Sequence, residues 1–229
     1  MLPIRDNVPT RRFPVVTVAI IVANLAVWVL YEMQDLNRAI LDFGYFPCEP
    51  VGDCSAPGGT WWTDVFTSMF MHGGWEHILG NMLFLWIFGN NVEDTLGRPR
   101  FVAFYFAGGA FATLSQTIVT LQAGSPEAAR IPNVGASGAI AAVLGAYLVL
   151  FPGGRVLTWV IPFFFFELPA MLFLGFWFLL QLFLGSGSFV QPEQGGGVAY
   201  FAHIGGFVFG LLAIKIFSAG RPRPVRPAY

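Results

Sequence analysis

The feature that most constrains this chain is a series of long apolar segments separated by short polar turns. Of its 229 residues, 55% are hydrophobic and only 11% are charged, whereas soluble domains carry about 25% charged residues. A helix of about 20 apolar residues crosses a hydrocarbon core of roughly 30 Å. Because lipid offers no partner to open backbone groups, each such segment must be helical. The sequence therefore predicts an all-α polytopic membrane protein.

We expect six transmembrane helices within one membrane domain over residues 13–217. The predicted spans cover residues 13–31, 75–92, 101–121, 134–151, 168–184 and 199–217. The apolar run at 157–185 is too long for one span and too short for two. Starting the fifth span at 168 leaves residues 156–166 along the inner interface and puts Glu167 at the membrane boundary, where a carboxylate costs less than at mid-bilayer.

The basic residues predict how these spans are oriented. Of the 12 lysine and arginine residues, only Arg38 and Arg130 fall on the outer side of the six-span arrangement. By the positive-inside rule, the N-terminal segment 1–12 and the tail 218–229 should face the cytoplasm. No small-residue cleavage site follows the first apolar run, so we expect an uncleaved span in the cell's inner (plasma) membrane.

The chain has two cysteines, Cys48 and Cys54, and both lie in the predicted outer loop 33–74. An outward-facing loop is exposed to oxidising conditions, which permit a disulfide between them. Two free or merely buried thiols are the alternative.

The polar side chains of three predicted spans share one depth in the membrane. His77 and Asn81, Ser137 and His203 each lie within about two turns of the start of a span that runs inward. Polar groups in lipid are costly, so by default they mark function or a water-filled interior. Each also has a structural alternative, since a lone histidine can be a packing group and the glycines around Ser137 can be only a close helix contact. Their common depth favours an assembled site.

The small residues near these groups indicate how the site would form. Gly206 and Gly210 share a helix face with His203, and Ala141 and Gly145 follow Ser137 along nearly one face of the fourth span. Such faces let two backbones approach closely. Packing them together would bring the Ser137 hydroxyl within hydrogen-bond reach of the His203 ring, the arrangement that activates a serine nucleophile. At a helix start, free N–H groups and the positive dipole end would also stabilise negative charge beside Ser137.

Three motifs resemble those of the rhomboid family of intramembrane serine proteases. They are HGGWEHILGN at 72–81, GASG at 135–138, and AHIGG at 202–206 followed by Gly210. The order and placement of these motifs resemble the family over residues 13–217. The resemblance implies a rhomboid-like bundle of six transmembrane helices. It also implies a serine endopeptidase that cuts a peptide bond in or near a substrate's transmembrane segment by a Ser–His dyad.

The resemblance implies a role for each matching residue. Ser137 would be the nucleophile and His203 the general base and acid. The oxyanion hole would consist of His77, Asn81 and the Ser137 backbone N–H, while His72 would order the outer edge of the site. The motif glycines would support these groups: Gly135, Gly138, Gly206 and Gly210.

Two positions depart from the family pattern. Many members have a Trp-Arg pair in the first loop, where this chain has Thr63 and Asp64. Some carry an aromatic residue four positions after the serine, stacked on the histidine, where this chain has Ala141. Another group must then orient the ring, and Tyr200 and Phe201 are the candidates.

Other functions stay open on sequence alone. One is a catalytically inactive relative that binds transmembrane helices, although the retained serine, histidines and asparagine argue against it. Another is a transporter or proton path, but the one candidate carboxylate, Glu167, fits the inner boundary better than mid-membrane. A bis-histidine haem is disfavoured because His72 and His77 do not share a helix face. We expect no cofactor, metal or nucleic acid, with lipid and substrate transmembrane segments as partners.

Overall fold

The computed structural model describes residues 2–54, 59–160, 164–190 and 198–221, and most of them are helical. Four helices are long and apolar enough to cross a membrane: Val15–Glu32, Arg98–Ala123, Ala170–Gly187 and Tyr200–Phe217. The first consists of α1 (Val15–Val27) and a π-helical turn, and the others are α6, the greater part of α8 (Ala170–Val190), and α9. The expectation of a largely helical, multi-pass membrane protein is thus confirmed.

Two further helical stretches lie where the second and fourth spans were predicted. α4 (Trp75–Phe84) continues through a π-helical turn, Leu85–Gly89, into α5 (Asn90–Leu96). α7 (Ser137–Leu150) is apolar but has only 14 residues. The number of six membrane crossings stays a prediction.

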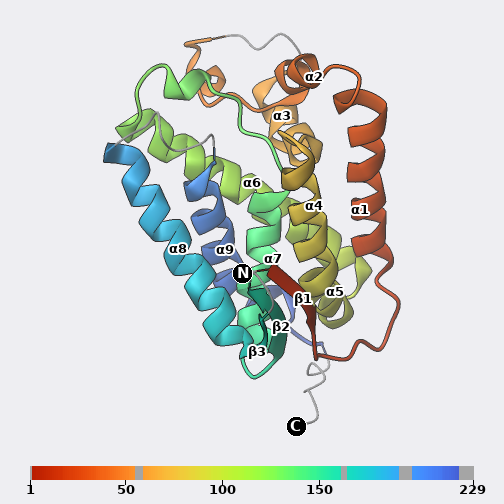
Figure 1. Cartoon of the computed structure of the whole chain (residues 1–229). Helices are drawn as coiled ribbons and strands as arrows, with labels where there is room; N and C mark the ends of the chain where they lie inside the picture. Colours follow the sequence, from red (N-terminus) through yellow and green to blue (C-terminus); the bar gives the residue numbers. More distant parts are fainter. Residues whose placement is uncertain (1, 55–58, 161–163, 191–197, 222–229) are drawn as a thin grey trace.

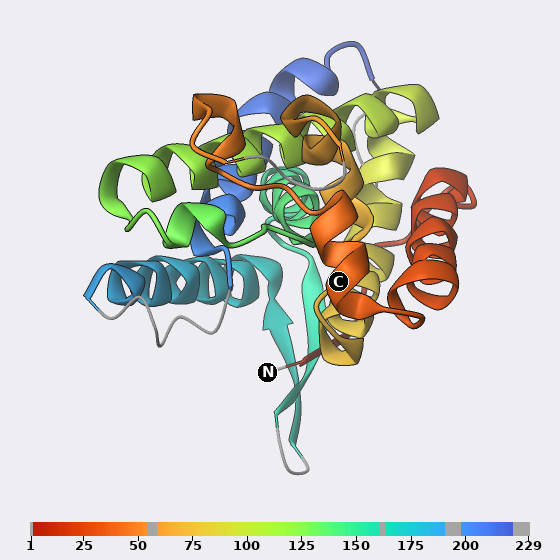
Figure 2. The same cartoon turned by 90° about the horizontal axis from the view of Figure 1, so that it is seen from above.

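α7 lies at the centre of the bundle. In the view from above it is seen end-on, surrounded by the other long helices (Figure 2). Every residue from Ala139 to Tyr147 is buried. A helix enclosed by protein does not need to present a full lipid-length surface on its own, which explains how a short α7 can still run through the core.

Glycines bring α7 and α9 into backbone contact. A Cβ added at Gly206 would meet the carbonyl oxygen of Gly138, and one added at Gly210 would meet that of Ala142. Because a backbone oxygen within a helix cannot swing aside, neither position has room for a side chain. The close contact holds the first two turns of α7 against the N-terminal half of α9.

We expect Gly210→Ala to destabilise the protein by about 1–3 kcal/mol, the usual cost of overpacking a close contact. Thermal unfolding in detergent micelles would measure the change. Gly175→Ala on α8 is the matched control, since a Cβ there meets nothing within 4 Å. If Gly210→Ala were as stable as that control, the proposed tight contact between α7 and α9 would be wrong.

The expectation of an all-α chain is wrong at one end of the bundle, where the described residues form a small sheet. β1 (Leu2–Asp6), β2 (Arg155–Val160) and β3 (Phe164–Pro169) pair antiparallel in the order β1-β2-β3. Figure 1 shows this sheet at one end of the bundle and α2 (Leu36–Phe43) with α3 (Trp61–Thr67) at the other.

The sheet replaces the flat interfacial segment predicted at 156–166, of which residues 161–163 lie outside the described part. Val156 and Thr158 are fully buried, so β2 has a β-branched inner face. Strand pairing satisfies backbone groups that an irregular segment would leave open. Because Leu168 and Pro169 belong to β3, α8 begins two residues later than the predicted fifth span.

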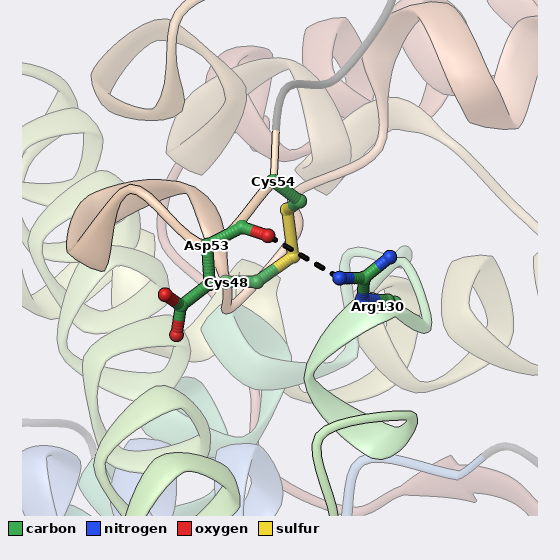
Figure 3. The surroundings of a disulfide bond; sticks show 4 residues. All are labelled: Cys48, Asp53, Cys54 and Arg130. Atoms are coloured by element: carbon green, nitrogen blue, oxygen red, sulfur yellow. Dashed lines mark hydrogen bonds between the residues drawn. A yellow bond between two sulfur atoms is a disulfide. The ribbon is translucent and has the colours of Figure 1, made fainter.

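The loop between α1 and α4 is folded and carries a disulfide between Cys48 and Cys54, whose Cα atoms are 5.5 Å apart (Figure 3). The Cys48 N–H donates to the Ala129 carbonyl at 3.0 Å. The Arg130 guanidinium donates to the Asp53 carbonyl at 3.4 Å (Figure 3). The disulfide loop is therefore bound to the segment that leads into α7.

Local hydrogen bonds anchor the part of this loop that lacks the Trp-Arg pair. Thr63 lies in the first turn of α3, and its hydroxyl accepts from the Thr60 N–H at 3.2 Å. Asp64 is 2% exposed. The Thr67 hydroxyl donates to the Phe43 carbonyl at 2.9 Å, which ties α3 to α2.

Candidate active site

The structure brings Ser137 and His203 together between α7 and α9. The His203 Nε2 atom lies 2.8 Å from the Ser137 Oγ atom, a distance typical of a good hydrogen bond. Ser137 is the first residue of α7, so its own N–H belongs to the first turn and has no intrahelical partner. A serine hydroxyl, a histidine ring and a free backbone donor thus meet at one point.

Gly135 keeps the space beside the serine open. Its φ of 122° is a backbone conformation that residues other than glycine rarely adopt. A Cβ there would lie 2.7 Å from His77 Nε2 and 3.5 Å from Ser137 Oγ. The missing side chain therefore leaves room between the hydroxyl and the His77 ring. The Gly135 N–H donates to the Ser68 carbonyl at 2.9 Å, which holds this turn in place.

His77 is held so that one ring nitrogen can donate toward that space. Its Nδ1 atom accepts a hydrogen bond from the Gly73 N–H at 3.2 Å. In a neutral imidazole one nitrogen accepts and the other carries the proton. The proton of neutral His77 is then on Nε2, the atom beside Gly135.

Asn81 and His72 contribute buried polar atoms near His77. Asn81, one helical turn after His77 on α4, is 7% exposed, and its Nδ2 atom has no hydrogen-bond partner among the described residues. The His72 and His77 rings meet edge to face with their centroids 5.1 Å apart. The His72 N–H donates to the Glu32 side chain. Burial, and then the neighbouring His77, lower the pKa of His72 to about 3, so that ring is neutral at neutral pH.

Two residues of α8 contact the His203 ring, and neither was predicted from the sequence. The Gln181 Oε1 atom lies 2.8 Å from His203 Nδ1. The Trp177 ring lies beside the imidazole, with centroids 5.8 Å apart and planes inclined by 38°. These contacts lie on a helix other than the one that carries Tyr200 and Phe201. The available signal was Gln181 itself, a strongly polar residue within an apolar span.

A third unpredicted residue, Gln116 of α6 (Arg98–Ala123), fixes the start of α9. Its Oε1 atom accepts from the Phe201 and Ala202 N–H groups at 3.1 and 3.2 Å. The first N–H groups of a helix need such acceptors. Gln116 thus sets the position of the helical turn that carries His203.

A cavity of about 30 Å³ adjoins Ser137, and its wall includes Ser68, Thr113, Gln116 and Gly138. This space is large enough to hold water. Among the described residues, no group of three or more histidine, cysteine, aspartate or glutamate side chains could hold a metal ion.

This architecture and geometry define a class of protein, a multi-pass helical membrane protein with a serine–histidine pair within its bundle. The chain belongs to the rhomboid family, because residues 58–220 match the family model described as Rhomboid domain. The family predicted from the three motifs is thereby confirmed.

Individual relatives agree with this assignment. The chain is 31% identical over 147 residues to the mitochondrial presenilin-associated rhomboid-like protein of Bos taurus, covering 63% of this chain and 35% of that protein. It is 32% identical over 152 residues to the mitochondrial rhomboid protein 1 of Saccharomyces cerevisiae, covering 65% and 40%. It is 28% identical over 143 residues to YdcA of Bacillus subtilis, covering 61% and 64%. The matches thus span little more than a third of the length of the mitochondrial relatives.

Proposed function

We propose that this protein is an intramembrane serine endopeptidase that cleaves a peptide bond in or near the transmembrane segment of a membrane-protein substrate. The observation that carries the proposal is the 2.8 Å contact between Ser137 Oγ and His203 Nε2. Membership of the rhomboid family, whose members are generally proteases of this type, supports it. A serine that is only a helix-packing residue would not need a histidine nitrogen aimed at its hydroxyl.

In the proposed reaction, Ser137 and His203 act as a dyad. His203 Nε2 takes the hydroxyl proton while Ser137 Oγ attacks the substrate carbonyl carbon. The tetrahedral intermediate collapses, the peptide C–N bond breaks, and His203 returns the proton to the leaving amine. A water molecule, deprotonated by His203, then attacks the acyl-enzyme and releases the second product and free Ser137.

The negative charge on the carbonyl oxygen needs donors already in position. We assign this oxyanion hole to the Ser137 backbone N–H, His77 Nε2 and Asn81 Nδ2. The opening left by Gly135 between His77 and Ser137 would receive the oxygen. The Asn81 amide supports this assignment, since a buried donor that finds no partner among the described residues can gain one when substrate binds.

The partners in this proposal are lipid and transmembrane helices. A scissile bond must lose its helical hydrogen bonds before a nucleophile reaches its carbonyl. We therefore expect substrates with glycine, proline or other helix-weakening residues near the cut.

Labelling with a fluorophosphonate, which phosphonylates activated serines, tests the proposal directly. The wild-type protein should be labelled at one serine, and Ser137→Ala should not be labelled. Ser186→Ala is a matched control because Ser186 is exposed on α8 and its hydroxyl donates to the Phe183 carbonyl of the same helix. Equal labelling of Ser137→Ala and the wild type would refute Ser137 as the nucleophile.

We also propose six crossings of an inner (plasma) membrane, with both ends of the described chain in the cytoplasm. The bias of the basic residues supports this orientation. Single cysteines at Asn37 and Ala219, both exposed, can be tested with a membrane-impermeant maleimide. The disulfide keeps the native cysteines unreactive. In intact cells, only position 37 should react, and labelling of position 219 from outside would contradict the orientation.

A further inference from the structure

One amide side chain connects α8 to the serine–histidine pair. Gln181 is 7% exposed, and its Oε1 atom lies 2.8 Å from His203 Nδ1. We infer that Gln181 is a positioning residue of the reaction, which fixes the proton of His203 on Nδ1 and leaves Nε2 free to act as the base. This inference rests on the proposed function.

The placement of Gln181 follows from the two faces of α8. Leu174 is fully buried, and Trp177 and Gln181 continue the same face at spacings of three and four residues. Leu179 and Phe183 on the other face are 63% and 73% exposed. An unpaired amide buried at this depth would be costly. The contact with His203 supplies the partner that makes a glutamine tolerable on this face.

The direction of the hydrogen bond decides which nitrogen carries the proton. An amide oxygen can only accept, so His203 Nδ1 must be the donor. Nε2 of the neutral ring is then unprotonated and accepts from the Ser137 hydroxyl at 2.8 Å. The reversed amide would place the proton on Nε2 and leave Ser137 without a base. With the amide oxygen of Gln181 facing His203, one continuous chain of hydrogen bonds therefore runs from α7 through α9 to α8.

A neutral partner has consequences that a carboxylate would not have. In a Ser–His–Asp triad the third residue orients the ring and also stabilises the imidazolium that forms during reaction. An amide keeps the orienting role without placing a full negative charge beside lipid, where desolvation is costly. Trp177 packs beside the same ring and restricts its tilt. Ala141 of α7 has no ring that could pack against His203, and residues of α8 orient the imidazole instead.

Three variants of the full-length protein in lipid vesicles test this role. Gln181→Leu removes the acceptor while keeping a similar volume. Gln181→Glu keeps the acceptor and adds charge. Leu179→Ala, on the exposed face of the same helix, is the matched control. Each is measured for kcat and KM against a tagged single-span substrate across pH, and by ¹⁵N NMR of the protein's three histidines.

We expect wild-type His203 to carry its proton on Nδ1 when neutral. In Gln181→Leu both neutral tautomers of His203 should be populated. The value of kcat should fall about 10- to 100-fold with little change in KM, because only part of the usual contribution of general base catalysis is lost. Gln181→Glu should restore the Nδ1 proton. It should also move the acidic limb of the pH profile to higher pH by about one unit, because a carboxylate favours the charged imidazole.

Two results would overturn the inference: a wild-type His203 with its proton on Nε2, or a Gln181→Leu protein with unchanged tautomer and a kcat equal to that of Leu179→Ala. If Gln181→Leu fails to fold, the wild-type spectrum and the pH profile of Gln181→Glu still decide. The NMR measurement needs no turnover. Loss of the proposed function would show instead as a wild-type protein that neither cleaves nor reacts with fluorophosphonate.

Discussion

Ser137→Ala and His203→Ala should each lower kcat for cleavage of a transmembrane substrate by about 10⁶-fold, the loss found when the serine or the histidine of a catalytic triad is removed. The two losses should be similar in size, because the serine is a weak nucleophile without the base, and the base has no hydroxyl proton to take without the serine. Purified protein in lipid vesicles, with a panel of tagged single-span substrates, gives the measurement.

The double variant should be no worse than either single variant, since the two residues act as one unit. Ser186→Ala should cleave at the wild-type rate and controls for loss of an unrelated serine. Thermal unfolding of each variant separates lost chemistry from lost folding. If Ser137→Ala cleaved as fast as the wild type, the protein would be better described as a relative that binds membrane helices without cutting them.

Asn81→Ala and His77→Ala should each lower kcat by about 10²- to 10³-fold with the fold intact, the usual cost of removing one oxyanion donor. KM should change less than kcat, because these donors act on charge that develops in the transition state. Asn37→Ala on the exposed surface of α2 is the matched control for Asn81. The rates are measured with the same vesicle assay.

His77 allows a sharper comparison than simple removal. His77→Gln keeps a donor group of similar reach and should recover part of the activity that His77→Ala loses. Should both alanine variants keep full activity, the oxyanion assignment would be wrong even if Ser137 and His203 react as proposed. The fluorophosphonate test is independent of that outcome, since it reports the serine alone.

The nature of the protein could be predicted because lipid leaves a chain few choices. Apolar runs of span length predict helices, and polar residues inside them stand out against that background. Ser137 and His203 were found in this way, and the motifs around them indicated the family. The glycines near both residues also predicted that their helices would touch, and α7 and α9 do meet through Gly206 and Gly210.

The small sheet could not be predicted from the local pattern of apolar and polar residues. β1 and β2 are separated by some 150 positions in the chain. The pairing of Leu2 with Trp159 therefore depends on how the helices pack and bring the two segments together. The segment 156–166 is almost entirely apolar, so it shows no clear alternation of buried and exposed positions. Its apolar composition suited a membrane interface equally well, which is why a flat segment was predicted there.

The sequence alone determined the membrane class, the approximate positions of the helices and the serine and histidine to which we assign the chemistry, because burial in lipid and the spacing of small and polar residues are local properties. The tertiary structure decided what surrounds His203. Ala141 has no aromatic ring that could stack on the histidine. Trp177 and Gln181 contact the imidazole because of the way α8 is rotated about its own axis. That rotation is set by how helices distant in the chain pack, because an almost uniformly apolar helix can turn any of several faces inward at similar cost.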